Sequence, residues 1–252
     1  MKQGLAAFIF AWACVGCGGT ETHDSGELVR HSIIWMEDQH GHAIGVMNVV
    51  AAPEASLHSH SAVMRVEVPE DEHGDVYVGS RPGFHSAMDH GYDGTDQSHW
   101  GHGFDPWVEP APHLAAYAWE AVDNWNSVGV GSQMMKGLQD GDCDIVSGEI
   151  SVCGRNHGHV SFGYTIGVNA AGLAAQYFNS DGHIRASVVE VCQNCGYSTD
   201  FMFYLLKHEM GHSMGLGHST DCGSVMSACS SRPRWINQHD RDTLWQKYNH
   251  YP

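Results

Sequence analysis

The feature that most constrains this chain is the stretch HEMGHSMGLGH at residues 208–218. Two histidines four residues apart lie one turn above each other on an α-helix, so the imidazoles of His208 and His212 can reach the same point. Gly215 can adopt a positive φ that ends the helix and turns the chain back, which brings His218 to that point as well. Three imidazoles around an open position are a typical ligand set for catalytic Zn2+. The stretch therefore predicts a zinc site with His208, His212 and His218 as its ligands.

Glu209 follows the first of these histidines and can lie beside the open position as a general base. The alternative is an ordinary helix with solvated histidines. This chain contains 20 His and 30 Gly residues, so chance matches must be considered. Five fixed positions nevertheless match by accident in only roughly one such chain in a thousand, which favours the zinc site.

The stretch resembles the extended zinc motif HExxHxxGxxH of the metzincin metallopeptidases, which a methionine-containing turn follows. Ser219 comes directly after the third histidine and Met226 lies eight residues beyond His218, which is similar to the matrixins. Serralysins and astacins place a tyrosine two residues after that methionine, where this chain has Ala228. The matrixin resemblance is therefore the closer one. It implies that Met226 supports the zinc site from below as a packing residue.

The resemblance implies an α+β, zincin-like fold. We expect a twisted mixed five-stranded sheet, two long helices and a small C-terminal subdomain after the zinc-binding helix. Apolar periodicity predicts a helix over 112–128, and Ser198 is a good N-cap for the zinc-binding helix. A terminal helix is expected over 237–248.

A hairpin is predicted immediately before the zinc-binding helix. Residues 172–178 and 184–191 have strand character, and the turn Asn-Ser-Asp-Gly at 179–182 separates them. The resemblance implies that this hairpin supplies the edge strand that pairs with the substrate backbone. The alternative is a purely structural hairpin.

The N-terminus has the pattern of an export signal. A short apolar run at 5–15 follows Met1-Lys2 and is too brief to span a bilayer. The run ends in CVGCGG, which resembles a bacterial lipoprotein processing site with Cys17 as the lipidated residue. An ordinary cleaved signal peptide is the alternative. Either reading predicts export, to the bacterial cell envelope with a lipid anchor or as a secreted protein.

We expect three regions along the chain: a lipoprotein-type signal peptide at 1–16, a tether or N-terminal segment at 17–59, and a metzincin-like catalytic domain at 60–252. The N-terminal segment is polar, with one apolar piece at 43–52. The cysteine-switch sequence of matrixins is absent, so the sequence leaves open whether the chain has a latency mechanism.

Six cysteines remain once Cys14 is assigned to the signal peptide and Cys17 to the lipid. An even number in an oxidising compartment predicts disulfides, although the sequence allows 15 connectivities. Pairing of neighbours is the first hypothesis because each pair flanks a loop: 143–153, 192–195 and 222–229. The CxxC at 192–195 could instead be a redox or metal motif.

The formal net charge of −17 argues against nucleic acid and anionic membrane surfaces as partners. The stretch 85–102 is rich in His, Asp and Gly and could bind an additional Ca2+ or Zn2+. A solvated loop is the alternative, since its spacings fit no EF-hand or zinc-finger template.

The resemblance implies a zinc-dependent endopeptidase that cleaves polypeptide substrates, with one catalytic Zn2+ and with Glu209 as the general base. One alternative is a surface zinc-binding or adhesion lipoprotein with an inactive protease fold. Retention of Glu209 argues against it, because holding a metal does not require a base. A hydrolase acting on a non-peptide amide is a third hypothesis.

Lipid anchoring can be tested at Cys17. The Cys17→Ser substitution removes the thiol that would carry the lipid, so we expect the protein to leave the membrane fraction or to remain unprocessed. Mass spectrometry of the mature N-terminus provides the measurement. A soluble mature chain that begins downstream of Cys17 would contradict the anchor and favour plain secretion.

Overall fold

The computed structural model describes residues 28–29, 31–37, 43–55, 57–58, 62–65, 99–101, 103–179, 183–219, 221–227 and 232–249. The predicted signal peptide and Cys17 lie outside the described residues, as does all of the 85–102 stretch except residues 99–101. Across the described ranges, no helix has the length and apolar character needed to cross a membrane.

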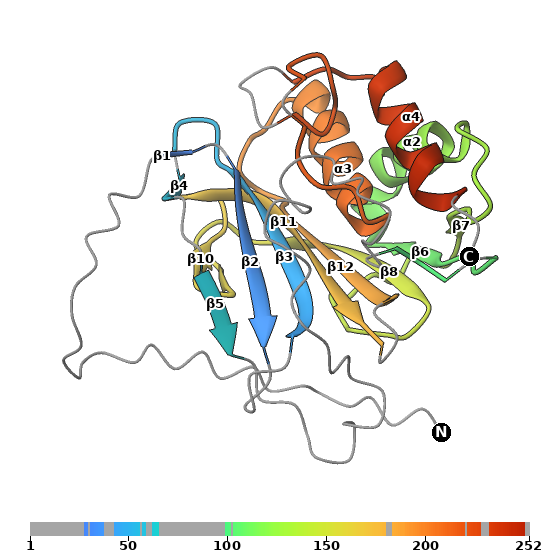
Figure 1. The fold of residues 1–252 in the computed structure, drawn as a ribbon. Helices are drawn as coiled ribbons and strands as arrows, with labels where there is room; N and C mark the ends of the chain where they lie inside the picture. Colours follow the sequence, from blue (N-terminus) through green and yellow to red (C-terminus); the bar gives the residue numbers. More distant parts are fainter. Residues whose placement is uncertain are drawn as a thin grey trace.

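In the described ranges, eight strands form a mixed sheet at the centre of the fold (Figure 1). In spatial order the strands are β5 (Ala62–Arg65), β2 (His31–Glu37), β3 (Ala43–Ala51), β11 (Ala170–Phe178), β12 (Ile184–Cys192), β8 (Glu149–Arg155), β6 (Trp107–Pro110) and the two-residue β7 (Met135–Lys136). Strands β2, β3, β11 and β12 are antiparallel to their neighbours within this group. The remaining pairs, β5 with β2, β12 with β8, β8 with β6 and β6 with β7, are parallel.

The prediction of a five-stranded sheet was wrong, because the segment expected to be a tether contributes strands. Strands β2 and β3 lie within 17–59, and β3 pairs with β11 along most of its length. Both strands are buried on both faces, so they have continuous apolar runs instead of the alternation that identifies a half-exposed strand. The sheet therefore begins well before residue 60.

Two further two-stranded pairings lie outside the main sheet. The first joins β1 (Leu28–Val29) to β4 (Leu57–His58), and the second joins β9 (Val160–Ser161) to β10 (Tyr164–Thr165).

The three predicted helices are confirmed. They are α2 (Ala115–Asn126), preceded by the 3₁₀ turn η2 (Pro112–Leu114), α3 (Thr199–Ser213) and α4 (Gln238–Tyr248). The Ser198 side chain caps α3 by accepting a hydrogen bond from the Phe201 N–H. Among its described residues, the chain after α3 contributes α4 and no strand of the main sheet.

The sheet separates two apolar cores. One lies under α2 and α3, where Ala118, Leu205 and Val189 share a cluster with Ile33 and Trp35 of β2. The other lies on the opposite face, where Ile34 and Met36 of β2 take part. Successive residues of β2 thus point to opposite faces, which places its odd-numbered positions on the face that α3 covers.

Strand β11 differs from the expected edge strand. It pairs with β12 on one side, as the hairpin prediction requires, but its other side pairs with β3. The edge that the resemblance assigned to substrate is occupied by a strand of the same chain.

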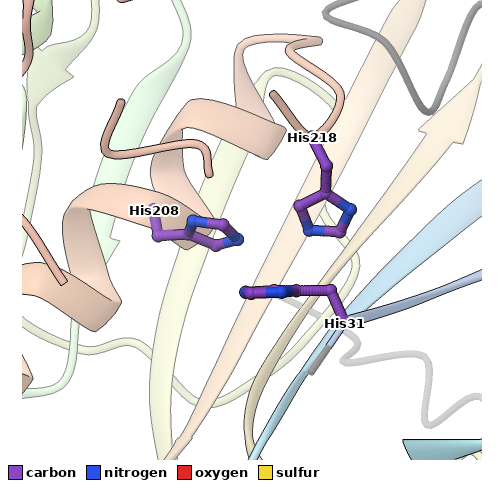
Figure 2. A group of neighbouring side chains, drawn as sticks. All are labelled: His31, His208 and His218. Atoms are coloured by element: carbon purple, nitrogen blue, oxygen red, sulfur yellow. The ribbon is translucent and has the colours of Figure 1, made fainter. Parts of the chain in front are cut away.

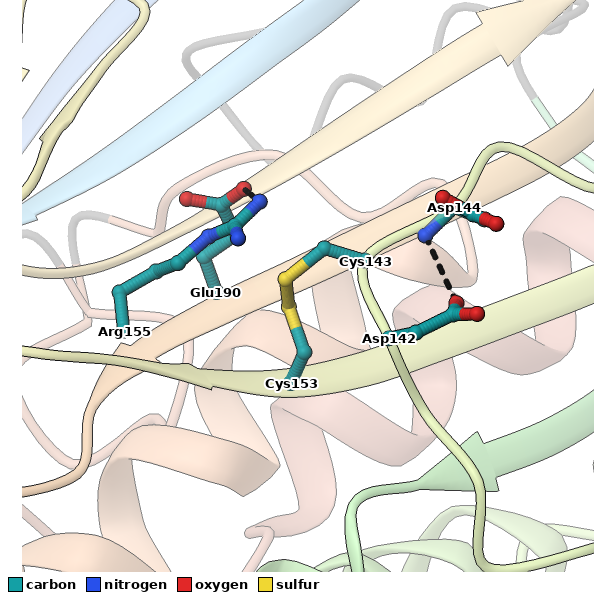
Figure 3. Close-up of a disulfide and its surroundings, with 6 residues drawn as sticks. All are labelled: Asp142, Cys143, Asp144, Cys153, Arg155 and Glu190. Atoms are coloured by element: carbon teal, nitrogen blue, oxygen red, sulfur yellow. Dashed lines mark hydrogen bonds and ion pairs between the residues drawn. A yellow bond between two sulfur atoms is a disulfide. The ribbon is translucent and has the colours of Figure 1, made fainter. Parts of the chain in front are cut away.

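Two of the three predicted disulfides are confirmed, Cys143–Cys153 and Cys192–Cys195. Figure 3 shows the first joining a loop to β8, next to the ion pair between Arg155 and the buried Glu190 at 2.8 Å. Cys222 is also disulfide-bonded. Its predicted partner, Cys229, lies outside the described residues, so that pairing stays a prediction.

The Cys143–Cys153 bond closes a loop with a sequence separation of 10 residues. Replacing both cysteines by serine should lower the free energy of unfolding by about 3 kcal/mol, because the unfolded chain regains loop entropy. The matched control is the double serine variant at 192 and 195, whose shorter loop should cost about 2 kcal/mol. Denaturant titration under oxidising conditions measures both, and an unchanged midpoint in the first variant would contradict a stabilising role.

Candidate metal centre

The end of α3 brings the three predicted zinc ligands together. His208 and His212 lie on the helix, and Gly215 has a φ of 89°, as the expected turn requires. The Gly215 N–H donates to the His212 carbonyl at 2.7 Å, and the Leu216 N–H donates to the Gly211 carbonyl at 3.1 Å. The helix therefore stops, and the chain reverses to place His218 beside the other two histidines.

The Nε2 atoms of these histidines converge. His212 Nε2 lies 3.0 Å from His208 Nε2 and 3.1 Å from His218 Nε2. Nitrogens bound tetrahedrally to zinc at 2.0–2.1 Å are about 3.3 Å apart. The separations in the structure are thus close to those that a shared metal would impose, and the residues fit Zn2+.

Backbone carbonyls fix the orientation of two of the rings. His208 Nδ1 donates to the Val225 carbonyl and His212 Nδ1 donates to the Leu216 carbonyl, both at 2.7 Å. A carbonyl can only accept, so each Nδ1 carries the proton and each Nε2 presents its lone pair to the centre. Burial lowers the pKa of His208 to about 4, although the hydrogen bond to Val225 opposes this. The His208 imidazole is therefore neutral at physiological pH, as metal binding requires.

Glu209 is buried beside these rings, and neither carboxylate oxygen has a hydrogen-bond partner among the described residues. Burial raises the pKa of this carboxyl well above its usual value. Gly172 of β11 faces it, and a Cβ there would lie 3.3 Å from Glu209 Oε1. A buried carboxylate without a partner needs a water, a cation or a substrate group, which fits a metal centre with a bound water.

Met226 packs beneath the site. It is fully buried, and a Cβ added to Gly211 would collide with its sulfur atom and with Trp125. The Ser219 N–H donates to the Met226 carbonyl at 2.8 Å, so the methionine turn runs beside the segment that carries His218. Glycine at 211, between the two helical histidines, leaves the space that the methionine fills.

Asp240 of α4 holds the methionine turn in place, and the motif spacing gave no indication of this. Its Oδ2 accepts from the Val225 N–H at 3.0 Å and from the Asn237 N–H at 2.9 Å, and its Oδ1 accepts from the Ser224 hydroxyl. Val225 is the residue whose carbonyl orients His208. The local sequence around Asp240 contains an Asn-x-x-Asp capping box at 237–240. This pattern predicts the start of a helix but does not indicate that Asp240 contacts the site.

His31 of β2 also lies at the site (Figure 2). Its ring centroid is 5.0 Å from that of His208 and 4.5 Å from that of His218. One nitrogen from each of the three rings lies within 4.8 Å of the others, so the group could hold a metal. His31 could not be predicted from the sequence, because it lies far from the motif in a segment expected to be a tether.

The additional metal site predicted in 85–102 lies mostly outside the described residues. Of its histidines, His99 is described and is buried. Its ring is 4.9 Å from His183 and 5.2 Å from Tyr248, and its Nδ1 lies 2.6 Å from the Trp100 carbonyl. The predicted extra Ca2+ or Zn2+ remains a hypothesis.

The role of Asp240 can be tested by Asp240→Ala. Removing the carboxylate leaves the buried Val225 N–H without its acceptor, so we expect a loss of about 3 kcal/mol in the free energy of unfolding. Zinc affinity should fall by about 10–100-fold, because His208 loses its rigid support. Asp242→Ala is the matched control, since Asp242 is exposed on the same helix and bonds only to Gln238 among the described contacts. Equal effects of the two substitutions would rule out this role.

The sequence model of the family described as Matrixin matches residues 68–249, which is more than half of the chain and includes α2, α3, α4 and the zinc motif. No match was found among curated protein sequences. Matrixins are metallopeptidases that typically depend on zinc, and the extent of the match shows that this chain belongs to the matrixin family.

Proposed function

We propose that the chain is a zinc-dependent endopeptidase in which His208, His212 and His218 hold one Zn2+ and Glu209 is the general base. The observation that carries this proposal is the convergence of three imidazole Nε2 atoms beside a buried carboxylate that has no hydrogen-bond partner among the described residues. Membership of a peptidase family supports a polypeptide as the substrate.

The residues around the centre divide the chemistry between them. When bound, zinc would polarise the scissile carbonyl and lower the pKa of a water toward about 7. Glu209 would accept the proton of the attacking water and pass it to the departing amine. The carbonyls of Val225 and Leu216 keep the ligand nitrogens directed at the centre throughout.

The rival hypotheses differ in what they require of Glu209. A zinc-binding or adhesion lipoprotein needs the three histidines but not the carboxylate. Burying a carboxylate is costly, so its retention beside the histidines favours a catalytic role. A hydrolase of non-peptide amides would use the same chemistry, and activity on an unstructured protein distinguishes it from an endopeptidase. We also propose that the protein is exported and that a lipid attached to Cys17 anchors it.

The roles of base and ligand can be separated by two substitutions. Glu209→Gln keeps size and ligands but removes the basic carboxylate, so zinc content should stay near one per chain while peptide hydrolysis falls by at least roughly 10²-fold. His218→Ala should weaken zinc retention and activity together. Zinc content and hydrolysis of an unstructured protein, with and without a chelator, are measured side by side.

Two results would contradict the proposal. Unchanged turnover in Glu209→Gln would place the base elsewhere. A wild-type chain that retains no zinc, or retains it equally well after His218→Ala, would show that these histidines are not the ligands.

A further inference from the structure

The N-terminal strands are an addition to the matched family region. The match begins at residue 68, after the end of β5, yet β2, β3 and β5 extend the sheet that the matched region builds. Strand β3 pairs with β11 from Gly45 to Ala51. Figure 1 shows these strands, in blue and teal, continuing the sheet beyond β11.

The register of these strands directs His31 at the metal centre. His31 lies opposite Val50 in the β2–β3 pair, and Val50 lies opposite Gly172 in the β3–β11 pair. Residues opposite each other in a sheet point to the same face. Gly172 is the residue against which Glu209 lies. His31 therefore shares a cross-strand row with Gly172 and projects onto the face that carries α3.

The His31 ring lies about as close to the His208 and His218 rings as the predicted ligands lie to one another. Ring centroids among His208, His212 and His218 are 4.6, 4.6 and 5.3 Å apart. The His31 centroid lies 5.0 Å from that of His208 and 4.5 Å from that of His218, which is almost the same range. Figure 2 shows the His31 ring reaching from its strand toward His208 and His218.

A fourth protein nitrogen changes what a zinc site can do. Catalytic sites keep one position open for water or substrate, whereas four protein ligands close the site. The four histidines and Glu209 are all buried, so the centre is shielded from solvent with the N-terminal strands in place. In addition, both sides of β11 are already paired, which leaves no edge there for an extended peptide.

We propose that His31 is a fourth ligand of the zinc and that β3 occupies the substrate position on β11, so that the intact chain is latent. The inference rests on the proposed zinc site at His208, His212 and His218. The ligand and the blocking strand belong to the paired strands β2 and β3, and displacing these two strands would open both the metal and the strand edge. The register of β2 and β3 places His31 at the centre, independently of its charge and of its distance from the motif in the sequence.

Coordination by His31 is tested by measuring metal binding to the full chain, with no substrate present. His31→Ala should weaken zinc affinity by at least about tenfold. Losing a residue that only hydrogen-bonds to a metal ligand already costs about 10–100-fold, so losing a ligand should cost no less. His31→Phe keeps a ring of similar shape without a nitrogen and should behave as His31→Ala does. In the Co2+-loaded protein, both substitutions should shift the visible absorption bands. Ser32→Ala is the matched control, because the next residue of β2 points to the opposite face.

Latency is tested by hydrolysis of an unstructured protein. His31→Ala should raise turnover by about tenfold or more, which corresponds to a competent fraction of a tenth or less in the wild type. Gly45→Ala provides an independent test, since a Cβ at that position would collide with the Gln176 carbonyl and loosen β3 from β11. Gly45→Ala should also raise turnover, although it leaves His208, His212 and His218 unchanged.

The outcomes separate this inference from the proposed function. Zinc affinity and Co2+ bands that are unchanged in His31→Ala, in a chain whose zinc depends on His218, would overturn the role of His31 and leave the zinc site standing. Zinc binding that does not depend on His218 would overturn the proposed function itself. Turnover no higher than wild type in both folded variants would overturn the latency and make the N-terminal strands an integral part of an already active domain. If Gly45→Ala does not fold, His31→Ala and His31→Phe decide the question by the same measurement.

Discussion

Imidazoles buried around one point depend on partners at their outer nitrogens to set their orientation. In this protein the Val225 and Leu216 carbonyls accept from the Nδ1 atoms of His208 and His212. These bonds select the tautomer in which Nε2 is a lone-pair donor, and burial keeps His208 neutral. The rest of the centre serves to keep those two carbonyls in place.

The support for this geometry comes from three separate places in the chain. The Leu216 carbonyl follows from the turn at Gly215, while the Val225 carbonyl belongs to the methionine turn. That turn is fixed by the buried carboxylate of Asp240 and by the packing of Met226 into the space above Gly211. A charged acceptor shared by backbone N–H groups is stronger than a neutral one, so α4 acts as a rigid support for the site.

The N-terminal strands address two physical problems at once. An uncovered β11 would present unpaired backbone groups, which is an aggregation hazard as well as a binding site for peptides. Pairing with β3 satisfies these backbone groups, and in the proposed latent state it also covers the edge that an extended peptide would use. The same register places the His31 ring 4.5 Å from that of His218, so covering the edge and the proposed closing of the centre are geometrically linked.

The sequence by itself determined the features that depend on local spacing. The helical period places His208 and His212 on one side of α3, Gly215 ends that helix, and neighbouring cysteines close short loops at 143–153 and 192–195. Only the tertiary structure shows that His31 and Asp240 lie at or support the site, how many strands the sheet has, and that β11 is not an edge strand. Those features depend on pairing between distant segments. Because β2 and β3 are buried on both faces, no periodicity in their residues reveals which strand they join or which side chain they present to α3.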